Sequence, residues 1–209
     1  MTVRDNIYKN YQKWWEAYAT LKRWLIPWFI EFIEKSHFKK KSALDIWCWN
    51  GKYLVYLKNI GFEVSGTDSS ETAVEMTKTA IGNEWDIMYK DMYEMDIKPD
   101  NFDLIMSIQA IHHWKKEEVK ILVKKIHSWL SNEGKIFLTL PDYQSSTYRN
   151  TFKDKEEIAP WTYSLLSWSE KWLPHSFFTK EEIKNMFNEF KNLKYELDGR
   201  GKRIITWEK

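Results

Sequence analysis

The chain has 209 residues, which is enough for one domain of ordinary size with additions. Lysine and arginine number 32 against 30 aspartates and glutamates, so no global charge points to nucleic acid or to a membrane surface. The single cysteine excludes an intramolecular disulfide framework and is typical of a reducing compartment. Since the N-terminus also lacks the apolar core of a signal peptide, we expect a cytoplasmic protein that does not bind a membrane.

Residues 1–42 precede the first expected strand and form an N-terminal helical cap. Their aromatic and apolar residues recur at helical spacing, and Pro27 predicts a break between two helices. The plainest interpretation is an amphipathic helix that packs on the edge of a sheet. Residues 43–209 form the main domain.

The main domain opens with a strand, a tight loop and a helix. Ala43, Leu44 and Ile46 predict a buried strand, and the apolar residues between 52 and 59 predict a helix. This order begins an open α/β sheet, in which ligands bind at the loops that follow the strands. Such a loop requires residues without side chains, yet two of its positions hold Trp47 and Trp49.

The segment 45–51 resembles motif I of the class I S-adenosylmethionine-dependent methyltransferases, Asp/Glu-x-Gly-x-Gly-x-Gly. Asp45 matches the acid and Gly51 the last glycine, whereas Trp47 and Trp49 fall on the first two glycines. The resemblance implies a Rossmann-like, doubly wound α/β fold: a seven-stranded, mostly parallel sheet with helices on both faces and an antiparallel last strand. It implies S-adenosylmethionine as the cofactor, bound in this loop by Asp45, Trp47, Cys48, Trp49, Asn50 and Gly51. Read literally, the two indoles would block that site.

The composition suggests a reason for the indoles. The chain has 13 tryptophans and only 7 glycines. Eight tryptophans stand where glycine is expected, and replacing them would bring glycine to the usual value of about 7%; they are Trp47, Trp49, Trp85, Trp114, Trp161, Trp168, Trp172 and Trp207. Our hypothesis is that the source organism reads UGA as glycine and that the printed sequence translates it as tryptophan. The alternative is a protein that is truly rich in tryptophan.

The second strand is expected to end at Asp68, with Ser69 or Ser70 capping the next helix. Asp68 lies 17 residues after Gly51, close to the spacing of about 20 at which Rossmann-type folds place a ribose-binding acid. A carboxylate suits that role because it can accept hydrogen bonds from both ribose hydroxyls. The alternative is a carboxylate that only favours the helix N-terminus. We assign Asp68 and Ser69 to the cofactor site.

The third strand, starting at Asp86, is expected to end at residue 90 or 91. In the resembled family an acid at this place receives the adenine amino group, and the amide of the next residue meets the ring. Asp91 and Met92 match that pattern. The alternative for Asp91 is a turn residue.

The fourth strand runs from Phe102 towards a pair of histidines, a common form of motif II and its sequel in the family. The resemblance implies that Ser107 closes the strand over the methionine end of the cofactor and that His113 lies near the transferred methyl group. His113 could be a general base or a polar wall of the pocket, and we favour the wall because methyl transfer needs mainly proximity and alignment. The histidine pair has no nearby cysteine or acid to complete a ligand set, so we expect no metal.

A helix over 117–130, a glycine turn at 132–134 and a strand over 135–140 resemble motif III. Residues 142–179 are rich in aromatic side chains and are interpreted as a lid with short helices of its own. A helix over 181–190 and strands near 194–197 and 203–206 complete the chain.

The resemblance implies an N-terminal flap over the cofactor, whose Tyr11 and Tyr18 would face the pocket. His113 and His175 are further candidate substrate contacts, and the alternative for His175 is a histidine packed within the lid. The expected activity is methyl transfer to a small molecule, since no basic stripe indicates nucleic acid. Two alternatives remain. A nicotinamide-dependent oxidoreductase is disfavoured because position 52 is lysine rather than the last glycine of that fingerprint. A non-catalytic binding protein of methyltransferase fold is favoured by Trp47 and Trp49 taken literally.

Overall fold

The computed structural model describes residues 25–91, 94–142, 144–145, 153–167, 170–171, 173–199 and 201–209. Tyr11, Tyr18 and Met92 lie outside the described residues, so their proposed contacts remain predictions. None of the described helices is both long and apolar enough to cross a membrane.

A seven-stranded sheet forms the centre of the domain, with the strand order β3-β2-β1-β4-β5-β10-β9. Strands β1 to β5 pair in parallel, whereas β10 pairs antiparallel with both β5 and β9. The bounds are β1 Ser42–Ile46, β2 Glu63–Asp68, β3 Asp86–Tyr89, β4 Phe102–Ile108, β5 Leu130–Pro141, β9 Lys191–Leu197 and β10 Lys202–Glu208. The expected seven-stranded sheet with an antiparallel last strand is confirmed.

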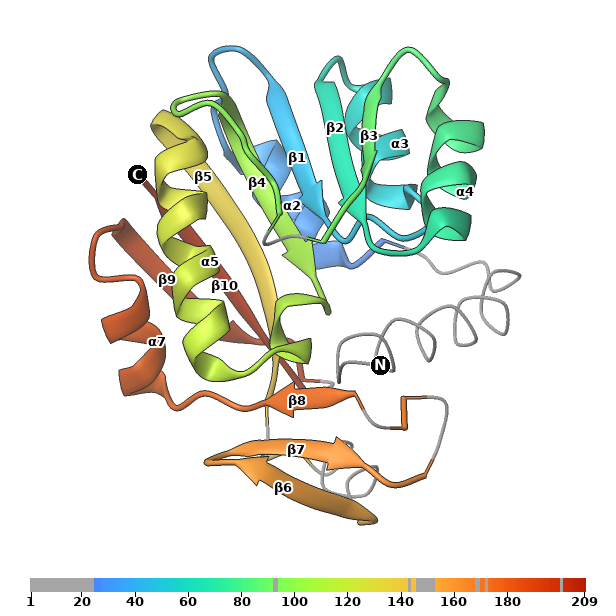
Figure 1. Cartoon of the computed structure of the whole chain (residues 1–209). Helices are drawn as coiled ribbons and strands as arrows, with labels where there is room; N and C mark the ends of the chain where they lie inside the picture. The colour runs from blue at the N-terminus through green and yellow to red at the C-terminus, as the bar shows by residue number, and fades with distance from the viewer. Residues whose placement is uncertain are drawn as a thin grey trace.

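Helices cover both faces of this sheet (Figure 1). One face carries α2 (Pro27–Lys35), α3 (Lys52–Asn59) and α4 (Glu71–Ile81), and the other carries α5 (Lys116–Trp129) and α7 (Lys180–Met186). Successive strand residues point to opposite faces. In β1, Ala43 packs in the cluster under α2, α3 and α4, whereas Leu44 and Ile46 pack in the cluster under α5 and α7.

Two expected helix caps are present. Ser70 accepts a hydrogen bond from the amide of Ala73 at the start of α4, and Thr179 forms a reciprocal capping box with Glu182 at the start of α7. Each cap satisfies backbone amides that the first helical turn leaves without an internal partner. These caps fix where two of the helices leave the edge of the sheet.

The helix-to-strand connection at 132–134 differs from the expected turn. α5 ends at Trp129 and β5 begins at once with Leu130, so Glu133 and Gly134 lie inside the strand. The register against β4 shifts here, and Glu133 has a φ of 64°. The residues that were expected to end the helix instead form an irregularity in the longest strand of the sheet.

Residues 142–179 do not contain the expected short helices in their described part. They form a three-stranded antiparallel sheet from β6 (Lys155–Ala159), β7 (Thr162–Leu165) and β8 (Pro174–Ser176), which we call the small sheet. In β7 Thr162 and Ser164 are buried and Tyr163 between them is half-buried, which is the alternation of a strand with one covered face. Among the described aromatic residues of this region, Tyr163 lies in a strand, for which tyrosine has a preference.

Candidate active site

The loop after β1 adopts a strained left-handed backbone at its two tryptophans. Trp47 has a φ of 67° and Trp49 a φ of 54°, and Gly51 follows with 66°. A residue with a side chain pays about 1–2 kcal/mol for this conformation. The loop holds its course because the amides of Trp47 and Cys48 both donate to the carbonyl of Thr67, at 2.8 and 3.0 Å.

Gly51 could not carry a side chain here. Apart from its positive φ, an added Cβ would lie 2.8 Å from the Cγ2 atom of Thr77 on α4. Thr77 in turn donates a 2.6 Å hydrogen bond to the carbonyl of Trp49. The loop is thus packed tightly against α4, with no room for a side chain at Gly51.

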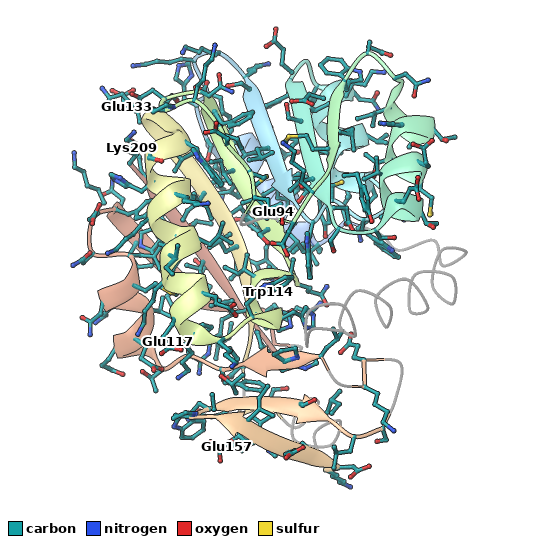
Figure 2. The ribbon with its side chains drawn as sticks, in the orientation of Figure 1. Glu94, Trp114, Glu117, Glu133, Glu157 and Lys209 are labelled. Atoms are coloured by element: carbon teal, nitrogen blue, oxygen red, sulfur yellow. The ribbon has the colours of Figure 1, made fainter. Side chains whose placement is uncertain are left out.

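The two indoles pack against residues from neighbouring elements. The ring of Trp47 lies 4.2 Å from that of Trp114 and 6.2 Å from that of His113, two residues that follow β4, and it also packs against the main core. Figure 2 shows Trp114 between the carboxyl end of β4 and the small sheet. Trp49, together with Trp47, packs against Ala73 and Leu173.

The backbone separates the eight tryptophans that the composition treats alike. Trp161 shares the left-handed conformation, with a φ of 57°, whereas Trp85, Trp114 and Trp207 do not have a positive φ. Trp207 lies in β10 and stacks on Phe187 at 3.7 Å in the core. Trp168 and Trp172 lie outside the described residues. Among the described tryptophans, the backbone supports the glycine hypothesis at three positions.

Asp68 stands at the end of β2 and is buried. Its carboxylate accepts hydrogen bonds from the amide of Trp49 at 3.0 Å and from the amide of Ser70 at 2.9 Å. Burial raises the pKa of Asp68 to about 7, against the opposing effect of the amides of Ser70, Trp49 and Ser69. The acid therefore lies beside the loop after β1, where a ribose-binding acid is expected.

Asp45 is the second buried acid of this edge. One of its oxygens, Oδ1, is buried and has no hydrogen-bond partner among the described residues. Burial raises the pKa of Asp45 to about 8, with a further rise from the charge of Asp68 and a small opposing effect of Lys52. A buried carboxylate oxygen without a hydrogen-bond donor lowers the stability of the fold unless a ligand supplies that donor.

Four other residues that were expected to bind the cofactor have surroundings that differ from one to the next. Cys48 is buried beside Thr77, with its sulfur 3.6 Å from the threonine oxygen, and burial raises the pKa of its thiol. Ser107 donates to the carbonyl of Ile46 at 3.1 Å and so joins β4 to β1. Asn50 lines a surface groove along α4. Asp91 is buried just after β3.

Three histidines meet where the main sheet contacts the small sheet. His112 and His113 end a short 3-10 helix, η1 (Ile111–His113), and His175 lies in the middle of β8. The ring of His113 lies 4.0 Å from that of His112 and 4.5 Å from that of His175. Burial lowers the pKa of both His112 and His113, and the neighbouring imidazoles lower it further, so both rings are neutral near pH 7.

Sequence reasoning identified His113 and His175 singly and did not place them together. It also missed Glu170, whose carboxylate lies 2.9 Å from Nε2 of His175. The available signal was weak, because His113 follows an expected strand whereas His175 lies in the expected lid, 62 positions further along the chain. The pairing depends on how β8 docks on η1.

Comparison with known proteins identifies the class. The family model described as "methyltransferase domain" matches residues 44–138. A tRNA (carboxymethyluridine(34)-5-O)-methyltransferase of Saccharomyces cerevisiae is 25% identical over 57% of this chain and 43% of that protein. A phosphoethanolamine N-methyltransferase of Plasmodium falciparum is 26% identical over 63% of this chain and 50% of that protein. The chain spans about half the length of these curated relatives.

The fold agrees with this match. A solved S-adenosylmethionine-dependent methyltransferase from Methanosarcina mazei superposes with a TM-score of 0.69 at 16% identity, over 88% of this chain and 98% of that one. The sheet order, the loop after β1 and the acids at the ends of β1 and β2 define a Rossmann-like methyltransferase domain. Residues 44–138 match the methyltransferase-domain family model, and the chain has the fold of the class I S-adenosylmethionine-dependent methyltransferases.

Proposed function

We propose that the chain binds S-adenosylmethionine at the carboxyl ends of β1, β2 and β4 and transfers its methyl group to an acceptor on the side of the small sheet. The observation that carries this proposal is the pair of buried acids, Asp45 and Asp68, beside a loop with a left-handed glycine. Ligands of open α/β sheets bind at this edge.

The acids fit the cofactor. Asp45 has a buried oxygen without a partner among the described residues, and both acids have a raised pKa. A ligand that brings hydroxyl donors and positive charge would lower the free-energy cost of burying both carboxylates in their ionised form. Asp68 would accept the ribose hydroxyls, Asp45 would face the amino-acid end, and Asp91 would receive the adenine amino group. The bound cofactor supplies a methyl group on a positively charged sulfur.

The two indoles fit the cofactor less well than glycine would. Both pack against Ala73 and Leu173, and the ring of Trp47 lies against that of Trp114, which follows β4. We therefore propose that the printed chain binds the cofactor weakly and that glycine at both positions allows full binding. One remaining indole would still occupy the space.

His113 contributes to the acceptor side. It is buried, and its Nδ1 atom lies 3.2 Å from the carbonyl of Pro174, so the neutral ring donates there and leaves Nε2 as an acceptor. The ring can therefore wall the pocket and orient a hydroxyl or amine. His175 and the flap residues Tyr11 and Tyr18 are proposed as further substrate contacts.

The proposed acceptor is a small molecule in the cytoplasm, in keeping with the balanced charge of the chain. A second candidate is a modified tRNA uridine, which is favoured by the match to the yeast tRNA methyltransferase. Methyl-labelled cofactor, incubated separately with a small-metabolite extract and with purified tRNA, distinguishes the two by the fraction that becomes labelled.

The proposal is tested by calorimetric titration of S-adenosylmethionine into the printed chain and into the double variant Trp47→Gly/Trp49→Gly. The double variant should bind, and adding Asp68→Ala should weaken its binding by roughly 1.5–3 kcal/mol through loss of charge-assisted hydrogen bonds. Asp96→Ala, at an exposed carboxylate, is the control and should leave the affinity unchanged. Failure of the double variant to bind would reject the proposal. Binding without labelling of any acceptor would favour the non-catalytic alternative.

A further inference from the structure

The three histidines at the junction of η1 and β8 form a compact buried cluster. His112 is 3% exposed, His113 6% and His175 1%. One ring nitrogen from each lies within 4.8 Å of the others. Three imidazoles are seldom buried together without a common partner, because each brings a polar nitrogen that must be satisfied.

The hydrogen bonds orient two of the rings for a common ligand. Nδ1 of His113 lies 3.2 Å from the carbonyl of Pro174, and Nδ1 of His175 lies 3.0 Å from the carbonyl of Leu173. A backbone carbonyl can only accept, so each Nδ1 carries a proton, and Nε2 is the ring atom that could coordinate an ion. Metal-bound histidines have this arrangement, in which the other ring nitrogen donates to a carbonyl or carboxylate.

Glu170 supplies an acid beside His175. Its Oε2 atom lies 2.9 Å from Nε2 of His175. A cation placed between these two side chains would contact both Nε2 of His175 and the carboxylate of Glu170. His112 adds an independent sign, since its Nδ1 is buried with no hydrogen-bond partner among the described residues.

We propose that His112, His113 and His175, with Glu170 as the fourth ligand, bind a divalent transition-metal ion, and that zinc is the ion this ligand set suits. Three imidazoles and one carboxylate are ligands that zinc accepts in four-coordinate sites. This site goes beyond the proposed methyl transfer and does not depend on it, but an ion bound here replaces the acceptor contacts proposed for His113 and His175.

The geometry requires a modest contraction. Nitrogen atoms bound to tetrahedral zinc at about 2.1 Å stand about 3.4 Å apart. The present limit of 4.8 Å shrinks to that value when the rings move together by about 1 Å. Rotation of the His112 ring, which no hydrogen bond at Nδ1 restrains, contributes to this movement.

The site would join two parts of the fold. His112 and His113 follow β4 of the main sheet, whereas His175 and Glu170 belong to the small sheet and the segment before it. Two hydrogen bonds already cross this junction, from the His113 ring to Pro174 and from the Ser176 hydroxyl to the carbonyl of Trp114. Four protein ligands make a closed site, which is the structural type, so the ion fixes the small sheet on the main domain.

The test uses the untagged, metal-free chain with His37→Ala and His127→Ala, which removes the only other histidines. Cobalt(II) is titrated first, because its visible absorption distinguishes four-coordinate from six-coordinate binding, and zinc is then added in competition. We expect one ion per chain in a four-coordinate site, displaced by zinc, and a higher melting temperature in the presence of zinc. Absence of four-coordinate cobalt in this protein would overturn the proposal.

Variants of single ligands assign the site. His113→Ala and His175→Ala should each lower zinc affinity by more than the ~10–100-fold that loss of a group supporting a ligand causes. Glu170→Gln lies at a partly exposed side chain, preserves folding and should weaken binding ~10-fold. His127→Ala alone is the matched control, since His127 also faces a glutamate, Glu189, at 3.7 Å but outside the cluster. Equal zinc affinity in His175→Ala, Glu170→Gln and the control would overturn the proposal, whether or not the chain methylates anything.

Discussion

The left-handed backbone at Trp47 and Trp49 leads to a prediction that separates strain from packing. At each tryptophan, two variants are made, one with glycine and one with alanine. Both lose the indole, so the loss of packing is nearly the same and cancels in their difference. What remains is the preference of the backbone for glycine or alanine at that position.

The expected sign follows from φ. At Trp47, Trp49 and Trp161 the φ values are 67°, 54° and 57°. Alanine keeps a strain of about 1–2 kcal/mol there, whereas glycine removes it and costs about 0.5–1 kcal/mol of chain entropy. The glycine variant should therefore be more stable than the alanine variant by about 0.5–1 kcal/mol at these three positions.

The same comparison has the opposite sign at Trp85 and Trp207, where φ is not positive. There glycine keeps only its entropic cost, so the alanine variant should be the more stable by about 0.5–1 kcal/mol. Urea unfolding followed by far-ultraviolet circular dichroism gives each free energy of unfolding. An alanine variant as stable as the glycine variant at both Trp47 and Trp49 would refute the reasoning from strain.

Two further predictions concern the buried acids and the core. Because burial raises the folded-state pKa of Asp45 to about 8 and of Asp68 to about 7 from 3.8, the folded chain binds more protons than the unfolded chain across this range, and its stability should fall as pH rises from about 4 to 8. Melting temperatures between pH 5 and 8.5 test this, and Asp45→Asn should flatten the dependence; an unchanged slope would show that Asp45 titrates normally. Phe187 is fully buried and stacks on Trp207, so Phe187→Ala should lower the free energy of unfolding by about 3–5 kcal/mol. Ile121→Ala on the exposed side of α5 is the control, expected within about 0.5 kcal/mol of the parent in the same urea assay, and equal effects would contradict the assignment of Phe187 to the core.

The sequence predicted the main sheet well because its central strands β1 and β4 are buried along nearly their whole length. The apolar run of β1 and the caps at Ser70 and Thr179 are local signals, and the structure has them where they were expected. The predicted turn at 132–134 was wrong because pairing with β4 extends β5 back to the end of the helix. That pairing is a long-range effect which local turn preferences do not contain.

The acceptor side was predicted less well. The small sheet has short strands whose alternation is brief, so aromatic content alone suggested a lid without its architecture. The histidine cluster depends on the docking of β8 against η1, which no local pattern encodes. The glycine hypothesis could be assessed only with the backbone conformation, because composition cannot distinguish Trp47 in a strained loop from Trp207 in a strand.

The position of β10 between β5 and β9 has a consequence for the order of assembly. β10 follows β9 in the chain, so the edge of β5 has no partner while residues 142–201 are synthesised. β5 is the longest strand of the main sheet, and an open strand edge of this length can pair with another chain. The β9–β10 hairpin is therefore the step that protects the nascent protein from aggregation, and substitutions that slow its closure should reduce the yield of folded protein more than the stability of the finished fold.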